Sequence, residues 1–186
     1  AERLRQAGYT VRRTSELGGL GLEAIVLGLP KGRSAVDAVR ELRALDPAGQ
    51  FDFNHLYFES GGVGRGAALA ASAGDPSGLR IGLVDGSAAQ SRPALADARL
   101  VQRAFAPGGA RASAHATAVA SLIVGARGAA PGATLEVADV YGPTPTGGSA
   151  EAIARGLAWL AQEKVAVINI SLVGPPNLLL GAAVQA

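Results

Sequence analysis

Short apolar runs alternate with helix-like stretches through the second half of this 186-residue chain. Runs dominated by Val, Leu, Ile and Ala are typical of strands that are buried on both faces. Such strands, alternating with helices, predict a parallel sheet covered by helices on both faces, which is an α/β fold. The expected strands are 79–85, 100–105, 134–140 and 165–170, and the expected helices are 115–124 and 149–163.

The first 60 residues follow a different order of elements. A helix end, two strands, a helix and an aromatic-rich strand would become a ferredoxin-like α+β unit if one more strand preceded residue 1. We expect that strand to be missing. Because position 1 is not Met, we expect the chain to begin at a processing or fragment boundary. The expected elements are a helix end at 2–7, strands at 9–13 and 22–29, a helix from Ala35 after the N-cap Ser34, and a strand at 51–58.

Residues 61–78 are rich in Gly, Ala and Ser and are expected to link the two parts. They begin with Gly-Gly-Val-Gly-Arg-Gly, which resembles a phosphate-binding loop in glycine content alone. This segment does not follow a strand within a βαβ unit, and it lacks the Walker lysine. We therefore divide the chain into a unit at 1–60, a linker at 61–78 and an α/β domain at 79–186.

Composition excludes several classes of function. The net charge is +2 and the arginines are scattered, not interleaved with aromatic residues, so we expect no nucleic-acid partner. The apolar stretches are too short or too interrupted to span a bilayer, so we expect no membrane partner. With no Cys and two His, no transition-metal site is expected, and no Asp-rich loop indicates calcium. We therefore expect no cofactor.

Two residues of the second half have positions and chemistry suited to catalysis. Asp85 closes the apolar run 79–85, and functional residues of parallel sheets collect at the carboxyl ends of strands. His115 begins a helical stretch thirty residues later. Taken singly, an Asp before Gly is often a turn former, and a His at a helix start is often a cap or a surface residue. Together they supply an acid and a base for nucleophilic catalysis.

The residues around Asp85 and His115 resemble two motifs of the subtilisin-like serine proteases, or subtilases. Two further segments resemble later motifs of the same family, in the same order, so that the resemblance covers 79–186. The four segments are Ile-Gly-Leu-Val-Asp-Gly-Ser at 81–87, Ser-Ala-His-Ala-Thr-Ala-Val-Ala at 113–120, Gly-Ala-Ala-Pro-Gly-Ala at 128–133 and Val-Ile-Asn-Ile-Ser-Leu-Val-Gly-Pro at 167–175.

The resemblance implies a role for each catalytic residue. Asp85 would hold the imidazole of His115 in the correct tautomer and stabilise its charged form. His115 would take the proton of a nucleophilic serine and then give it to the leaving amine. The family's serine motif and its oxyanion-hole asparagine are expected beyond Ala186. Ser121 and Ser171 lie in other motifs and are not substitutes.

The resemblance also implies two substrate-binding segments. In subtilases an extended segment pairs with the substrate backbone as an added strand would, and a second segment faces it from the opposite side. Small residues there let a peptide backbone approach closely. The residues concerned are Ser171, Leu172 and Val173 on one side, and Thr146, Gly147 and Gly148 on the other.

Three features depart from the family pattern. Gly86 and Ser87 stand where the family has a hydroxyl residue followed by glycine, so the hydroxyl is displaced by one position. Ala116 replaces the glycine after the catalytic histidine. Val173 replaces a glycine of the substrate strand, which changes the shape expected for the specificity pocket.

The unit at 1–60 resembles the N-terminal prodomain with which subtilases are commonly made. The segment 53–58, Phe-Asn-His-Leu-Tyr-Phe, resembles the end of that prodomain. The resemblance implies that this unit assists the folding of the catalytic domain and inhibits it.

The chain is identified as the amino-terminal part of a subtilisin-like serine endopeptidase, with the first half of its catalytic domain. Expected partners are a polypeptide substrate and the remainder of the catalytic domain, and the expected location is secreted or periplasmic. The alternative is a non-catalytic, truncated or degenerate subtilase fold that binds a peptide or a partner protein. A flavodoxin-like nucleotide-binding domain is disfavoured, because the Asp85 carboxylate at the strand end would repel a phosphate.

Overall fold

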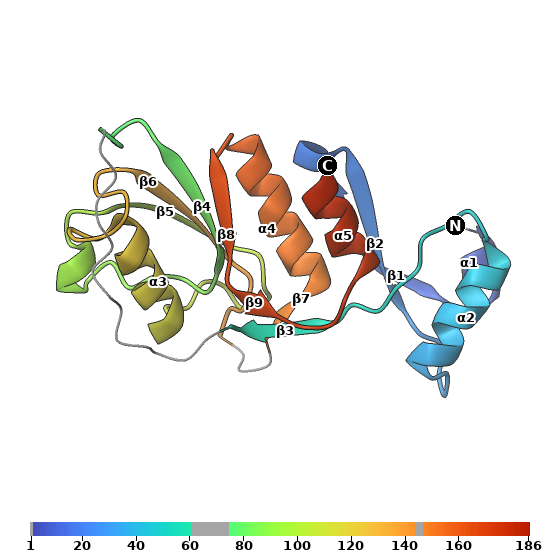
Figure 1. Ribbon diagram of the computed structural model, residues 1–186. Helices are drawn as coiled ribbons and strands as arrows, with labels where there is room; N and C mark the ends of the chain where they lie inside the picture. The colour runs from blue at the N-terminus through green and yellow to red at the C-terminus, as the bar shows by residue number, and fades with distance from the viewer. Residues whose placement is uncertain (1, 61–74, 144–146) are drawn as a thin grey trace.

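The computed structural model describes residues 2–60, 75–143 and 147–186 (Figure 1). Most of the linker expected at 61–78 lies outside these residues. The helices are α1 (Glu2–Gln6), α2 (Ala35–Leu45), α3 (Ala114–Val124), α4 (Ala150–Gln162) and α5 (Leu178–Gln185), with short 3₁₀ turns η1 (Gly18–Leu20) and η2 (Pro93–Leu95). The strands are β1 (Thr10–Leu17), β2 (Leu22–Gly28), β3 (Leu56–Glu59), β4 (Arg80–Asp85), β5 (Arg99–Ala104), β6 (Thr134–Asp139), β7 (Gly148–Ser149), β8 (Val167–Ile170) and β9 (Leu172–Val173).

A four-stranded parallel sheet with the order β5-β6-β4-β8 forms the centre of the second half. Its inner strands send alternate side chains into two separate cores. Leu83 of β4 shares a core with α3, whereas Val84 shares the other core with α4. Helices therefore cover both faces of the sheet, and the predicted α/β fold is confirmed.

Helix α4 is buried along most of its length. Ser149 caps its first turn, because the Ser149 hydroxyl oxygen accepts a hydrogen bond from the Ala152 N–H at 3.2 Å. Gly156 lets the helix lie close to the sheet, since a Cβ at this position would come within 3.0 Å of the Ala138 Cβ. Helix α4 thus packs tightly between the parallel sheet on one side and the strands β1 and β2 on the other.

The N-terminal hairpin of β1 and β2 packs on α4. Leu17 at the end of β1 is fully buried in the core that contains α4. The Ser15 hydroxyl donates a hydrogen bond to Glu151 Oε1 at 2.8 Å. Helices α1 and α2 lie at the end of the molecule away from the parallel sheet (Figure 1), over a small core of Tyr9, Ala38 and Leu42.

The order helix, two strands, helix and strand is present in the N-terminal unit, but its last strand has distant neighbours. β3 spans four residues, fewer than the expected 51–58, and it pairs with neither β1 nor β2. It is the middle strand of a three-stranded antiparallel sheet, between β7 and β9. The end of the N-terminal unit is thus built into the second half of the chain.

Two side chains fasten the segment before β3 to helices of the second half. Asn54 Oδ1 accepts a hydrogen bond from the Glu151 N–H at 3.0 Å, at the start of α4. Asp52 Oδ2 accepts one from the Leu178 N–H at 2.8 Å, at the start of α5. The first N–H groups of a helix have no partner within the helix, so these acceptors satisfy them. The extended chain is thereby led to the carboxyl end of the parallel sheet.

Among the described residues, the helices lack the combination of length and apolar character that crossing a bilayer requires.

Candidate active site

Asp85 is the last residue of β4, at the carboxyl end of the parallel sheet. Its side chain is fully buried, and the Gly86 N–H donates a hydrogen bond to Oδ1 at 2.7 Å. A buried carboxylate needs such donors because burial removes its hydration. The other oxygen, Oδ2, faces the start of α3.

His115 is the second residue of α3, and the loop after β4 fixes the start of this helix. The Ser113 N–H donates to the Ser87 carbonyl at 2.9 Å, and the Ser113 hydroxyl oxygen accepts from the Ala116 N–H at 3.0 Å. The imidazole therefore reaches the end of β4, where Nδ1 lies 2.8 Å from Asp85 Oδ2. The fold thus joins an acid and a base that lie thirty residues apart.

The other ring nitrogen of His115 contacts the end of β3. Nε2 lies 2.8 Å from the carbonyl oxygen of Ser60. Both ring nitrogens thus face acceptor oxygens, an arrangement that suits a doubly protonated, positively charged imidazole. A peptide carbonyl lies directly at the nitrogen that would act as a general base.

Burial and charge both act on this pair. Burial raises the pKa of Asp85 from 3.8 to about 6, although the Gly86 N–H and the charge of His115 act in the opposite direction. Burial also lowers the pKa of His115. The Asp85 carboxylate, the Ser60 carbonyl and the Glu59 charge outweigh this effect, so the pKa of His115 is raised above 6.5. The pair therefore binds protons more tightly than the two side chains would in water.

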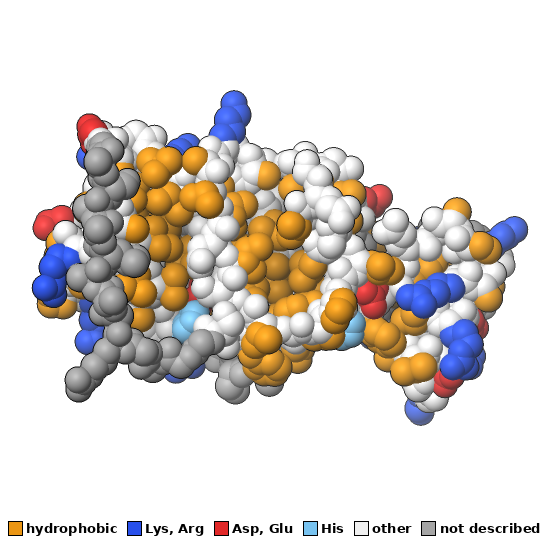
Figure 2. All heavy atoms as spheres, viewed as in Figure 1, with side chains coloured by type: hydrophobic (Ala, Val, Ile, Leu, Met, Phe, Trp, Pro, Cys, Tyr) orange, Lys and Arg blue, Asp and Glu red, His pale blue; other side chains and the backbone are white. Residues whose placement is uncertain are grey.

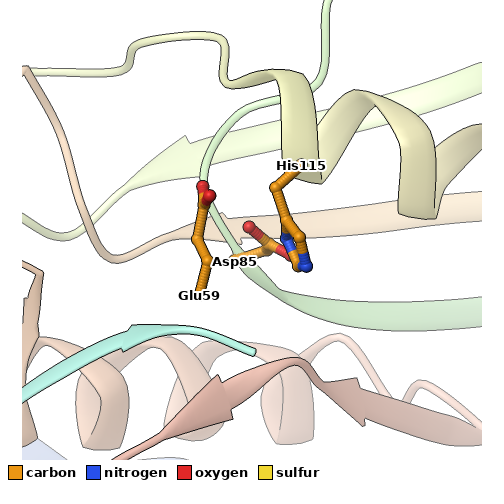
Figure 3. A group of neighbouring side chains, drawn as sticks. All are labelled: Glu59, Asp85 and His115. Atoms are coloured by element: carbon orange, nitrogen blue, oxygen red, sulfur yellow. The ribbon is translucent and has the colours of Figure 1, made fainter. Parts of the chain in front are cut away.

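Glu59 completes a group of three side chains of metal-binding type. One polar atom each of Glu59, Asp85 and His115 lies within 4.8 Å of the other two, with Asp85 in the middle (Figure 3). Metal binding requires these groups to lose their protons. Asp85 Oδ2 and His115 Nδ1 instead lie at hydrogen-bond distance, 2.8 Å apart, and the pKa of each group is raised. The geometry therefore favours an acid–base pair over a metal site.

The segments expected to bind substrate lie on the two sides of β3. Both pairings are antiparallel, so β3 occupies the position of a peptide added to an existing strand. Gly147 also lies close, since a Cβ there would come within 2.1 Å of the Tyr57 carbonyl oxygen. Thr146 lies outside the described residues. The backbone partners of this strand are Gly148 and Ser149 in β7, Leu172 and Val173 in β9, and Ser171, whose carbonyl accepts from the Ser60 N–H at 3.0 Å.

A family model described as the subtilase family, Peptidase_S8, matches residues 81–184, which is more than half of the chain. The chain belongs to the subtilase family. The matched residues include Asp85, His115 and both segments that flank β3, whereas β3 itself lies outside the match.

Two solved protease structures resemble this subtilase. The protease domain of PatA, as a serine-to-alanine mutant, has 27% sequence identity and a TM-score of 0.52, over 61% of this chain and 48% of that chain. The prenylagaramide maturation protease PagA has 26% identity and a TM-score of 0.50, over 60% of this chain and 42% of that chain. The subtilase chain thus matches less than half the length of either structure. A search of curated proteins found no significant match.

Two of the departures from the family pattern, at Gly86–Ser87 and at Ala116, lie next to each other in the structure. Gly86 packs against the start of α3, where a Cβ would come within 3.1 Å of Ser113 Oγ. The displaced hydroxyl, on Ser87, donates to Asp139 Oδ2 at 2.7 Å. The methyl group of Ala116 is fully buried beside this loop. The substitutions thus accompany a loop in which the hydroxyl contacts the neighbouring strand.

Asp139 is a buried acid that sequence reasoning missed. It ends β6 in register with Asp85 at the end of β4, and it is fully buried. Its carboxylate ties together the loops around the site, because it accepts hydrogen bonds from four donors. A signal for it exists in the sequence, since the two neighbouring strands each end in an Asp. The donors are the Ser87 hydroxyl at 2.7 Å, the Arg111 N–H at 2.9 Å, the Tyr141 N–H at 3.0 Å and the Gly142 N–H at 2.9 Å.

Proposed function

We propose that this subtilase is the amino-terminal part of a serine endopeptidase in which Asp85 and His115 are the acid and the base of a catalytic triad. One arrangement carries the proposal: Asp85 Oδ2 lies 2.8 Å from His115 Nδ1, and a strand-paired peptide carbonyl lies at His115 Nε2. The nucleophilic serine and an oxyanion-hole asparagine would come from a later part of the protein. That division agrees with a chain that matches less than half of each similar protease.

Each group then has a defined step. His115 Nε2 takes the proton of the serine hydroxyl while the serine oxygen attacks the carbonyl carbon of the substrate. Nε2 next gives this proton to the leaving amine, and an acyl-enzyme forms. Water attacks the acyl-enzyme by the same proton transfers and releases the acid. Asp85 accepts the Nδ1–H throughout, so that Nε2 points at the serine and the imidazolium is stabilised.

We further propose that residues 1–60 are an inhibitory prodomain, 61–78 a linker and 79–186 the first half of the catalytic domain. β3 lies between the two proposed substrate-binding segments and pairs with both. The Ser60 carbonyl oxygen lies at His115 Nε2, where the hydroxyl of the catalytic serine would have to lie. Bound in this way, the segment excludes other peptides and stabilises the helices that it caps. A polypeptide substrate, a catalytic domain completed by later residues and a secreted or periplasmic location belong to the same proposal.

A fluorophosphonate probe tests the proposed function, because it reacts with an activated serine. The full-length protease should be labelled stoichiometrically once residues 1–60 have been cleaved from the folded protein and removed, and His115→Ala in that protein should abolish labelling. Residues 1–186 alone should stay unlabelled. Labelling of a serine within 1–186 would show that the active site is misplaced, and a protease that stays unlabelled after removal of residues 1–60 would contradict catalysis.

The second candidate is a non-catalytic subtilase fold that binds a peptide. It is favoured by the way β7 and β9 hold β3, since backbone pairing requires no catalysis. The gene sequence after Ala186 distinguishes the two functions. A Gly-Thr-Ser motif downstream supports the peptidase, and its absence supports the binding protein.

A further inference from the structure

Ser87 and Asp139 form a buried hydrogen-bonded pair beside the candidate active site. The Ser87 hydroxyl donates to Asp139 Oδ2 at 2.7 Å, and the two residues are 5% and 0% exposed. A hydrogen bond to a buried carboxylate is among the stronger ones, because the acceptor is charged and little water competes for it. Ser87 follows Asp85 by two residues, and Asp139 lies in register with Asp85 on the neighbouring strand. The pair therefore borders the proposed catalytic acid on two sides.

Ser87 also holds the segment that leads into α3. Its N–H donates to the Arg111 carbonyl at 3.3 Å, and its carbonyl accepts from the Ser113 N–H at 2.9 Å. Ser113 is the N-cap of α3, and His115 follows two residues later. The position of Ser87 therefore sets where α3 begins and how the imidazole of His115 approaches Asp85.

Asp139 Oδ2 clamps the two segments that meet at Ser87. It accepts the Ser87 hydroxyl from the loop after β4 and the Arg111 N–H, at 2.9 Å, from the segment before α3. Loss of the hydroxyl would leave Arg111 on this oxygen but free Ser87 from it. Such a loss matters because a misplacement of about 1 Å, caused by a change away from the reacting atoms, can lower a rate roughly 10²-fold.

The second oxygen of Asp139 serves the opposite side of the site. Oδ1 accepts the Tyr141 N–H at 3.0 Å and the Gly142 N–H at 2.9 Å, directly after β6. β7 lies against the end of the same strand, since a Cβ on Gly148 would come within 2.9 Å of Val140 Cγ2. One carboxylate thus connects the helix that carries the base with the backbone on which a substrate-binding segment rests.

We propose that Ser87 and Asp139 are positioning residues for peptide hydrolysis, which hold His115 against Asp85 and, through Asp139 Oδ1, also support β7. The inference rests on the proposed peptidase function. It goes beyond that function by giving a catalytic consequence to the hydroxyl that is displaced by one position from the family pattern.

Ser87→Ala in the full-length protease, freed of residues 1–60 after folding, is the first test. The substrate is acetyl-Leu-Tyr-Phe-Glu-Ser joined to a fluorogenic amine, which copies residues 56–60. Complete labelling with the fluorophosphonate probe counts the active sites, so that kcat refers to folded enzyme alone. We expect kcat to fall about 10- to 100-fold. KM should stay within about twofold, because the segments that pair with the substrate keep their contacts.

Ser121→Ala is the matched control. It removes a serine hydroxyl from the same helix as His115, and that hydroxyl donates to the Thr117 carbonyl within α3 at 2.7 Å. Its loss leaves the contacts of Ser87 and Asp139 in place. We expect kcat and KM to stay within about twofold of the wild-type values.

Asp139→Ala tests whether the hydroxyl acts through the carboxylate. Both oxygens are removed, so kcat should fall at least as far as in Ser87→Ala, and KM should rise at least about threefold as β7 loses support. Ser87→Ala added to this variant should lower kcat by less than about threefold, because the partner of the hydroxyl is already gone. If Asp139→Ala does not fold, Ser87→Ala and its control decide alone.

A wild-type kcat in Ser87→Ala, with a lowered melting temperature, would show that the pair only stabilises the fold. That result would overturn the inference and leave the peptidase function intact. An undiminished effect of Ser87→Ala in the Asp139→Ala background would overturn the coupling between the two residues. If the probe does not label the wild-type protease freed of residues 1–60, the proposed function fails, and the inference fails with it.

Discussion

Asp85 and Asp139 end neighbouring strands in register, yet they have different partners. Asp85 accepts from one loop N–H and lies against the imidazole of His115, so its protonation is coupled to that ring. Asp139 accepts from four donors in the surrounding loops. Their surroundings therefore distinguish a carboxylate that can take part in proton transfer from one that organises the loops.

Asp139→Asn tests the structural role of this carboxylate. The amide nitrogen donates where a carboxylate oxygen accepted, so at least one buried donor loses its acceptor. We expect the free energy of unfolding to fall by about 3 kcal/mol in denaturant titrations. Asp97 is exposed, so Asp97→Asn, the matched control, should change the free energy of unfolding by less than about 0.5 kcal/mol. Equal, small effects of both substitutions would contradict the role given to Asp139.

The raised pKa values predict how stability depends on pH. Between 3.8 and about 6 the folded chain binds the Asp85 proton that the unfolded chain releases, so this contribution to stability is lost as pH rises through about 6. The contribution of His115 is complete below 6.5 and is lost as pH rises through its raised pKa. We expect thermal melts to show a stability that falls from pH 4 upward, with a shallower slope in an Asp85→Asn, His115→Gln double variant. An identical slope in both proteins would contradict these shifts.

At the scale of elements, the sequence predicts well what depends on local pattern. The apolar runs correspond to β4, β5, β6 and β8 within two residues at each end, and the helical periodicity corresponds to α3 and α4. The two-residue strands β7 and β9 have no pattern of their own, because they exist through pairing with β3. The role of Asp139 was missed for a related reason: its donors come from three separate segments that the fold brings together.

Asn54→Ala tests how the segment before β3 is held. The substitution removes the acceptor at the start of α4, and loss of a cap of this kind costs about 1 kcal/mol. We expect that decrease in the free energy of unfolding, together with faster amide exchange at Tyr57 and Phe58. Unchanged exchange at these two amides would show that strand pairing alone holds β3.

At the scale of the whole molecule, the second half exposes apolar surface at one edge of its sheet. Within the described part of the chain, β8 pairs with β4 and has no strand on its other side. Val167 and Ile170 of β8 are 57% and 42% exposed. Figure 2 shows hydrophobic side chains on the face of the molecule that carries β8, α4 and α5. Unpaired edges and apolar patches of this kind promote association.

Residues 1–186 on their own should therefore associate in solution. We expect light scattering to show oligomers whose size grows with concentration, and Val167→Lys to reduce the association by placing a charge on the edge. Adding the remaining part of the catalytic domain should also suppress it. A monomer with a sharp, reversible thermal melt would contradict this expectation and favour the non-catalytic function.

The turnover of the full-length protease carrying Asp85→Asn, measured after residues 1–60 have been removed from the folded protein, tests the central claim most directly. Asparagine keeps the shape of the side chain but no longer holds His115 in the tautomer that leaves Nε2 free as a base. We predict a folded protein whose kcat for peptide hydrolysis is lowered roughly 10⁴-fold. A folded Asp85→Asn protease with near-wild-type kcat would contradict the assignment of Asp85 and His115 as the catalytic acid and base.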